Sequence, residues 1–482
     1  MTAAKFTSGS TMRHVAVMTA TSSFGLLALF FVDAINLFYI SMLGVTELAA
    51  AIGFAGTLQF FMISISIGLL IAGSANVSRA IGAGDTERAR HLASSATLTA
   101  FLAMSVIAAL VWIWREEALY LIGARGEALV EASHFLAIAL PSVPLIGIGM
   151  SCSGTLRAIG EANRAMYVTL GGGAVAAVLD PILIFVFDLG LTGAALAMVL
   201  TRIVIAGIGL WLVIVKHDML ARPSLPVWLA DLPPILKIAG PAIATQLSTP
   251  FGNAYLTNTV AAYGDEAVAG WAVIGRVSAL AFGGLYALAG AVGPIVGQNF
   301  GAGLFDRIRS TYRDALIFVV GYVLVSWIAL IILAPHIATG FGLTGVGSTV
   351  LTTFAYYAAG AFAFTGALFV ANSAFNNLGR PLWSTMFNWS RDALVIPLLV
   401  FAFAGSLGAV GAVWIQAVAG IIVGTCATIV GWRTVGETAV DPGTAEGAAT
   451  ITTPAFSSGR AATGLASEAA SPEPLVRSGE NR

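Results

Sequence analysis

The stretch AIGAGDTERAR at residues 80–90 decides the fold, because its pattern returns as NFGAGLFDRIR at residues 299–309. In each copy a Gly-Ala-Gly turn follows a long apolar run and precedes two arginines. The copies are 219 residues apart, and ELAAAIGFAG, which starts at Glu47, matches EAVAGWAVIG, which starts at Glu266, at the same spacing. A repeat of this length predicts a chain built from two related halves.

Two more pairs of glycines extend the duplication. Gly160 matches Gly379 at the offset of 219, and Gly190 matches Gly408 at 218, which a one-residue difference in a loop explains. Each half holds six apolar runs. An even number of spans preserves the direction of the chain, so we expect parallel halves related by an axis along the membrane normal, with a cleft between them.

The composition places these halves in a membrane. Apolar residues make up 58% of the chain and charged residues only 10%, with a mean hydropathy of +0.89, whereas soluble domains are about 25% charged. The net charge of -1 offers no basic surface to nucleic acid. Cys152 and Cys426 lie in separate apolar runs and predict neither a disulfide framework nor a metal site.

The apolar runs are long enough to cross a bilayer as helices, which need about 20 residues each. The expected spans are 14–42, 47–77, 91–114, 131–156, 164–187, 191–215, 235–260, 266–296, 314–334, 348–375, 383–403 and 407–432. The predicted fold is therefore an all-α integral membrane protein with about twelve transmembrane helices in two parallel-repeat six-helix bundles around a central cleft.

Basic residues predict the orientation, because short cytoplasmic loops are enriched in Lys and Arg. With both termini inside, the cytoplasmic connections carry Arg79, Arg88, Arg90, Arg157, Arg164, Lys216, Arg222, Lys237, Arg307, Arg309, Arg313 and Arg380. The outer loops hold Arg115 and Arg125, each beside glutamates. We expect a multi-pass protein of the inner (plasma) membrane.

The predicted spans divide the chain into five parts. These are a cytoplasmic N-terminus at 1–13, an N-terminal six-helix lobe at 14–217, a cytoplasmic linker at 218–234, a C-terminal lobe at 235–432 and a tail at 433–482. The tail is rich in Ala, Thr, Gly, Ser, Pro and Glu, a composition typical of disorder.

Several short segments together resemble one transporter family. They are VD at 32–33, LG at 43–44, ELAA from Glu47, AIGAGD from Ala80 and PIVGQNFGA from Pro294. Across residues 14–432 the chain resembles the multidrug and toxic compound extrusion (MATE) transporters. The resemblance implies export of organic, drug-like cations in exchange for protons or sodium, two lobes that rock about a central cavity, and a monomeric state.

Two carboxylates lie within predicted spans of the first half. Asp33 and Asp180 are surrounded by apolar sequence, and burial of an acid in lipid is costly enough to need a reason. If they face one another, repulsion and burial favour proton binding, whereas a carboxylate pair could also hold sodium or pair with an arginine. The family resemblance likewise assigns the acids at these positions to an ion site.

The surrounding positions favour protons over sodium. Family members usually carry an Asn four residues before the second acid and a Thr on helix 6, where this chain has Ala176 and Met198. Loss of two oxygen ligands disfavours a hard cation such as sodium. Arg202 on helix 6 is a further candidate modulator, because an ion pair with Asp180 would oppose proton uptake.

The second half contains no matching acidic site. Asp392 follows Arg391 directly, and Arg276 lies on a nearby predicted helix, so we expect Asp392 to neutralise an arginine. Substrate contacts are expected from aromatic and amide side chains on the helices that line the cleft, because aromatic faces suit flat cations. These candidates are Phe38, Tyr39, Phe54, Phe60, Phe61, Tyr255 and Asn258.

Three other functions are weaker interpretations of the same sequence. A lipid-linked oligosaccharide or polysaccharide flippase shares the architecture, but it would need more embedded arginines to hold pyrophosphate than Arg202, Arg276 and Arg391. An ion channel would need a filter-like loop. An enzyme would need a catalytic cluster, and the five histidines are scattered near span ends. We therefore predict a transporter without enzymatic activity or a cofactor.

Overall fold

A computed structural model describes the backbone of residues 4–41 and 46–440. Side chains are described in these ranges except at 28–38, 40–41, 46–47, 49, 404 and 439–440. Most of the predicted tail and the side chains of Asp33 and Phe38 therefore lie outside the described residues. The described backbone is helical, and it contains no β-strand in these two ranges.

The first half contains eight α-helices and four short helical turns. Their bounds are η1 (Lys5–Thr7), α1 (Thr11–Ser41), α2 (Thr46–Gly82), α3 (Thr86–Ile113), α4 (Arg115–Leu121), α5 (Gly126–Ala139), η2 (Leu140–Ser142), α6 (Val143–Ala158), α7 (Ala162–Pro181), η3 (Ile182–Val186), α8 (Gly190–Trp211) and η4 (Leu212–Lys216). Local chemistry explains several boundaries. Asp85, for example, caps α3 by accepting a hydrogen bond from the Arg88 amide at 2.8 Å.

The second half repeats this order. Its elements are α9 (Leu225–Ala261), α10 (Asp265–Ala281), α11 (Gly283–Gly301), α12 (Phe305–Gly340), α13 (Gly345–Thr353), η5 (Phe354–Ala358), η6 (Ala359–Ala361), α14 (Phe362–Asn377), α15 (Pro381–Trp389), η7 (Ser390–Val395), α16 (Ile396–Leu407), η8 (Gly408–Val410) and α17 (Gly411–Val440). The predicted linker is partly helical, because α9 begins inside it.

The predicted number of spans agrees with the structure. Ten helical stretches of the described chain are long and apolar enough to cross a membrane, and α10 with α11 forms an eleventh that is bent by 45°. Helix α1, at 31 residues, is long enough to be the twelfth. The Gly-Ala-Gly turns also form as predicted, with φ of +79° at Gly84 and +69° at Gly303.

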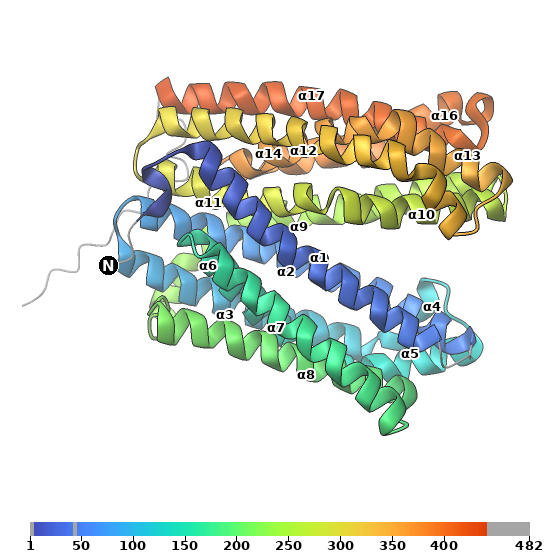
Figure 1. Cartoon of the computed structure of the whole chain (residues 1–482). Helices are drawn as coiled ribbons and strands as arrows, with labels where there is room; N and C mark the ends of the chain where they lie inside the picture. Colours follow the sequence, from blue (N-terminus) through green and yellow to red (C-terminus); the bar gives the residue numbers. More distant parts are fainter. Residues whose placement is uncertain (1–3, 42–45, 441–482) are drawn as a thin grey trace, which may run out of the picture.

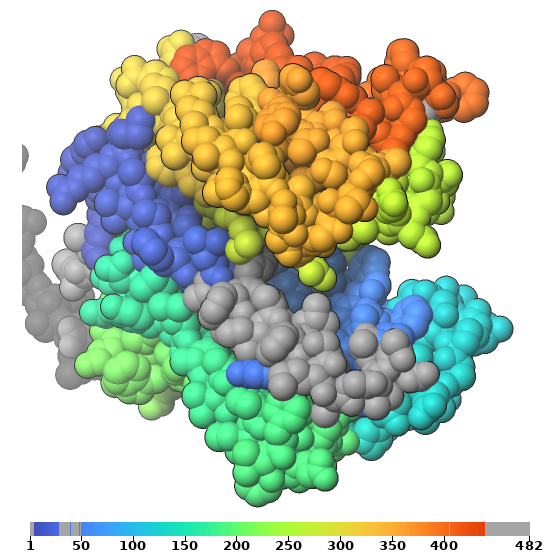
Figure 2. Space-filling view, turned by 45° about the vertical axis from the view of Figure 1, so that its right-hand side comes forward, coloured from blue at the N-terminus to red at the C-terminus, as the bar shows by residue number. Residues whose placement is uncertain are grey.

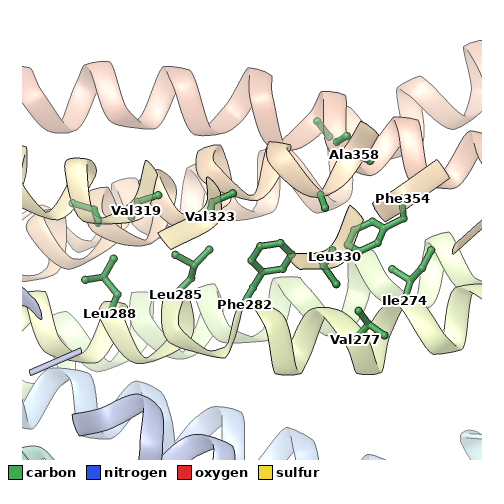
Figure 3. Close-up of a cluster of buried hydrophobic side chains, with 14 of the residues drawn as sticks. Ile274, Val277, Phe282, Leu285, Leu288, Val319, Val323, Leu330, Phe354 and Ala358 are labelled. Carbon is green, nitrogen blue, oxygen red and sulfur yellow. The ribbon is translucent and has the colours of Figure 1, made fainter. Parts of the chain in front are cut away.

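The helices form two layers, with α9–α17 above α2–α8 and with α1 crossing diagonally in Figure 1. Each lobe has its own apolar core. In the C-terminal lobe, Phe282, Leu285 and Leu288 point toward Val319 and Val323 (Figure 3). Such interdigitation buries these side chains, and each is at most 2% exposed.

The first helix of each half begins in the core of the other half. Val15 and Met18 of α1 pack in the core cluster of the C-terminal lobe. Ile235 and Ile238 of α9 pack in a cluster of the N-terminal lobe. The two lobes are therefore interlocked at the end of the bundle where the described chain begins, although the predicted lobe boundaries remain predictions.

Candidate functional site

Helices α2 and α11 meet at one end of the bundle with almost no space between their backbones. A Cβ atom added to Gly82 would lie 2.0 Å from the Gln298 carbonyl oxygen, and one added to Gly301 would lie 1.9 Å from the Arg79 carbonyl oxygen. Only glycine permits this approach. We call this the closed end; at the right-hand side of Figure 2 the two lobes are parted by a hollow.

Hydrogen bonds between the lobes reinforce the closed end. Arg79 donates from Nε to the Asn377 carbonyl at 3.1 Å and from Nη2 to the Asn376 carbonyl at 3.1 Å. Gln298 donates from Nε2 to the Ala158 carbonyl at 2.7 Å. Positions 79 and 298 are equivalent in the repeat, as are 158 and 377, so the two contacts are copies of one interaction.

The N-terminal segment adds a further contact at the closed end. Phe6 is 3% exposed, and its amide donates to Gln298 Oε1 at 3.0 Å. Arg307 donates to the carbonyls of Phe6 at 2.9 Å, Ser8 at 3.1 Å and Gly9 at 3.0 Å. These bonds fasten the start of the chain across the closed end.

Charged groups hold the same segment to the N-terminal lobe. Lys5 pairs with Glu161, which lies 3.5 Å from Arg164 Nε, and Arg164 contacts His217. Burial opposes ionisation of Glu161, but Lys5, Arg164 and His217 outweigh it and lower the pKa of this carboxyl group. Burial, followed by the charge of Arg164, lowers the pKa of His217.

The start of α9 is tied to the first half in a related way. Asp231 is fully buried, pairs with Arg88 at 2.6 Å and accepts a hydrogen bond from Ser95 at 2.6 Å. Trp228 donates to the Thr99 hydroxyl at 3.0 Å. Arg88 and Arg307 occupy equivalent positions, so each of them anchors the first helix of a half.

Asp180 is the described member of the predicted ion site. It lies near the end of α7, is 2% exposed, and precedes Pro181 and the π-helical turn η3. Because proline has no N–H, it leaves the Ala177 carbonyl without its usual helical donor, and π-helical turns often mark functional sites. The structure thus places a buried carboxylate at a break in a spanning helix.

Arg202 forms its hydrogen bonds with groups other than Asp180, the acid that the sequence suggested as its partner. The guanidinium is 5% exposed and donates to the Ala139 carbonyl at 2.8 Å, Ser142 Oγ at 2.9 Å, Gln59 Oε1 and Met198 Sδ at 3.1 Å. It makes no ion pair within the described part of the chain. Arg202 therefore stabilises the chain where α5 ends and α6 begins. It also contacts Met198, which lies on the same helix.

The other predicted site residues are dispersed. Tyr39 packs edge-on against Phe185 of η3, with ring centroids 5.9 Å apart, which brings the end of α1 beside the turn that follows Asp180. Ala176 is half-buried on α7. Phe54 and Tyr255 are half-buried against their lobe cores, whereas Phe60, Phe61 and Asn258 are exposed. Their roles as cavity residues remain predictions.

Asp392 pairs with an arginine, as the sequence predicted. Its two carboxylate oxygens accept from Arg391 Nε at 2.8 Å and Nη2 at 3.0 Å, and both side chains are nearly buried. The described residues contain no cluster of three or more His, Cys, Asp or Glu that could hold a metal ion.

A cavity in the C-terminal lobe was not predicted from the sequence. The cavity is about 80 Å³ in volume and lies between α9, α11, α14, α17 and the turns η5 and η6. Two amides line it, Asn253 and Gln416. Their position within apolar spans was visible in the sequence, and polar groups in such spans commonly mark functional sites.

A family model described as MatE matches residues 22–182 and 241–401, two segments whose first and last residues are both 219 positions apart. The chain belongs to the MatE family. The family match thus reproduces the repeat found in the sequence, and it identifies this MATE protein as a multi-pass membrane transporter rather than an enzyme.

Relatives of known name agree with this assignment. The FAD transporter of Shewanella oneidensis is 28% identical over 396 residues, covering 81% of this chain and 87% of that protein. The multidrug export protein MepA of Staphylococcus aureus is 26% identical over 390 residues, covering 79% and 84%. Both are transporters by name.

Solved structures show the same fold. The MATE transporter VcmN of Vibrio cholerae is 26% identical with a TM-score of 0.82, over 89% of this chain and 97% of that one. An outward-facing multidrug resistance transporter of the MATE family is 21% identical with a TM-score of 0.84, over 91% and 98%. The latter likeness concerns the fold alone.

Proposed function

We propose that this MATE transporter exports organic compounds in exchange for protons by alternating access. The observation that carries the proposal is Asp180, a carboxylate buried at a helix break within a lobe of a transporter. Such a group needs a functional reason in lipid, and reversible protonation supplies one. Asp33, whose side chain lies outside the described residues, is proposed as its partner in the ion site.

The surroundings of Asp180 support protons as the coupling ion. Ala176 and Met198 offer no oxygen ligands, and Arg202 is engaged by neutral acceptors instead of by Asp180. A sodium ion would need oxygens to replace its water shell, whereas a proton needs only the carboxylate.

We further propose that the closed end faces the cytoplasm of the cell. The basic residues of the predicted inner loops, among them Arg79, Arg88 and Arg307, gather at this end, as expected for cytoplasmic loops. The structure would then correspond to a state open to the outside of the inner membrane. A monomer of twelve helices suffices for this arrangement.

The substrates proposed are drug-like organic compounds, including cations. One relative is named for FAD and another for multidrug export, so the assay should cover both an anionic flavin and a cationic dye.

The proposal can be tested with the purified full chain in proteoliposomes. We expect ethidium transport when a pH gradient is imposed and no transport when a sodium gradient of the same size is imposed at equal pH on both sides. Transport that responds to sodium alone would overturn proton coupling. Absence of transport of both ethidium and FAD under either gradient would overturn the proposed export activity.

A further inference from the structure

The cavity in the C-terminal lobe is lined by hydrogen-bonding groups that have no partner in the described parts of the chain. Thr249, Asn253, Tyr286, Thr365 and Gln416 line it, and none of their side chains makes a hydrogen bond to another described residue. Asn253 and Tyr286 are exposed and the other three are half-buried, so the cavity opens at the surface of the lobe. Five hydrogen-bonding groups without a protein partner are therefore accessible to another molecule, either water or a ligand.

Other threonines on α9 behave differently. The hydroxyls of Thr245, Thr257 and Thr259 each donate to the carbonyl one turn back, at 2.8 to 3.0 Å. This is the usual way for a helical threonine to satisfy its hydroxyl in an apolar setting. Thr249, which lies on the same helix and lines the cavity, makes no such bond, so its hydroxyl is available there.

Aromatic rings form a fixed wall of the cavity. Phe362 stacks on Phe282 with centroids 4.2 Å apart and planes at 10°, and Phe354 meets Phe362 edge-on at 6.0 Å and 86°. Figure 3 shows Phe282 and Phe354 held within the packed core of the lobe. Because these rings support one another, they hold the ring of Phe362 rigidly beside the cavity, with Phe354 perpendicular to it.

The residues that line the cavity carry no formal charge. No Asp, Glu, Lys or Arg is among the residues that line the cavity. The nearby pair Arg391 and Asp392 neutralises itself, and it lies against Gly252, where a Cβ would be 2.8 Å from Asp392 Oδ1. Successive helical residues point about 100° apart. Asn253 therefore faces the cavity while Gly252 faces the ion pair.

The volume of the cavity limits the size of the ligand that it can bind. A site for an entire drug-sized molecule occupies about 300 to 1,000 Å³, whereas this cavity is about 80 Å³. Tyr286 is 42% exposed at its edge. The cavity therefore accepts one ring system edge-first, and the remainder of the molecule stays outside it.

We propose that this cavity is a recognition site for an uncharged planar ring that carries both hydrogen-bond donors and acceptors at its edge, such as a lactam or imide heterocycle. The amides of Asn253 and Gln416 bind the edge of the ring, Phe362 contacts its face, and Phe354 borders it. The inference rests on the proposed transport function and adds a substrate class to it. An organic cation finds no countercharge in this cavity.

The test uses the full chain in lipid nanodiscs and three probes. 1,8-Naphthalimide is uncharged and has an N–H between two carbonyls, N-methyl-1,8-naphthalimide lacks the donor, and tetraphenylphosphonium is a cation without hydrogen-bonding groups. We expect the wild-type protein to bind the naphthalimide at least fivefold more tightly than its N-methyl derivative. Equal Kd values for the two would overturn the proposal.

Two substitutions locate the site. Asn253→Leu and Gln416→Leu are each expected to raise the Kd for 1,8-naphthalimide tenfold or more and to change the Kd for tetraphenylphosphonium less than twofold. Asn163→Leu, at an exposed position at the start of α7, is the matched control and should change neither. Unchanged naphthalimide binding, or equal loss of both probes, would contradict the assignment.

If the leucine variants fold poorly, the variant Gln416→Glu provides a second test of the same site. A carboxylate placed in the cavity should weaken naphthalimide binding and strengthen tetraphenylphosphonium binding at neutral pH. No shift in preference would again overturn the proposal. Failure of the transport function is distinguishable, because it would abolish gradient-driven efflux by the wild-type protein, whereas failure of this inference would leave efflux intact.

Discussion

The two lobes repeat the same six helices but bury their charges in different ways. In the C-terminal lobe, Arg391 and Asp392 are adjacent and satisfy each other through two hydrogen bonds. In the N-terminal lobe, Arg202 is held by neutral acceptors, and the buried acid Asp180 lies on another helix. The difference teaches that a duplicated bundle can keep its packing while its two copies bury their charged side chains with different partners.

Disruption of the C-terminal pair should have the largest effect. Asp392→Asn leaves Arg391 buried with an uncompensated charge, and we expect the free energy of unfolding to fall by about 3 to 5 kcal/mol. Unfolding in mixed micelles would measure the change. The double variant Asp392→Asn with Arg391→Gln should cost clearly less, and an equal cost would show that the charge of Arg391 is not what destabilises the single variant.

Asp180→Asn tests the other side of the comparison. Because an amide cannot bind and release the proton, we expect pH-driven efflux to fall at least about a hundredfold, comparable to the loss of an essential charged group. Asp306→Asn, at an exposed position on α12, is the matched control and should retain transport. Efflux by Asp180→Asn at the wild-type rate would remove this residue from the ion site.

Gly301→Ala tests the feature that the lobes share. The added Cβ would lie 1.9 Å from the Arg79 carbonyl, so α2 and α11 must separate at the closed end. We expect about tenfold slower transport, together with labelling by a thiol reagent of a cysteine introduced at Ser78 in a Cys426→Ser background, which removes an exposed thiol. Gly321→Ala, where nothing lies within 4 Å of the added atom, should be neutral. Wild-type transport and protection in Gly301→Ala would show that this contact is not needed.

The smallest effect is expected at the partly exposed pair of Lys5 and Glu161. The pKa of Glu161 is lowered in the folded protein, so its stabilising contribution is present at neutral pH and is lost as the pH falls through that pKa. Solvent screening keeps the effect small. Glu161→Gln should alter transport less than twofold at pH 7 and flatten its decline at acid pH. An acid profile identical to that of the wild type would exclude Glu161 as the cause.

Features that depend on local sequence were predictable. The offset of 219, the apolar spans, the positive φ at Gly84 and Gly303 and the pairing of Asp392 with Arg391 all follow from short segments or from hydropathy. Such features need no knowledge of how helices lie relative to one another.

Features that depend on helix placement were not predictable. Gly82 was interpreted as part of a turn that serves topology and lobe packing, but its partner Gln298, which brings two helices together across the lobes, could not be named from the sequence. Arg202 was considered for Asp180, but its partners come from α2 and the α5–α6 break. The cavity beside Asn253 requires four helices to be positioned before it exists.

The closed end has the symmetry of a homodimer. Residues 79 and 298, 82 and 301, and 158 and 377 exchange the same contacts in both directions, and Ser78 meets its own equivalent, Gly297, near the pseudo-twofold axis. In an isologous interface of this kind, one patch binds another copy of itself. Within one chain the same geometry has a different consequence, because a substitution in one half alters only one of the two symmetric contacts and leaves its equivalent in place.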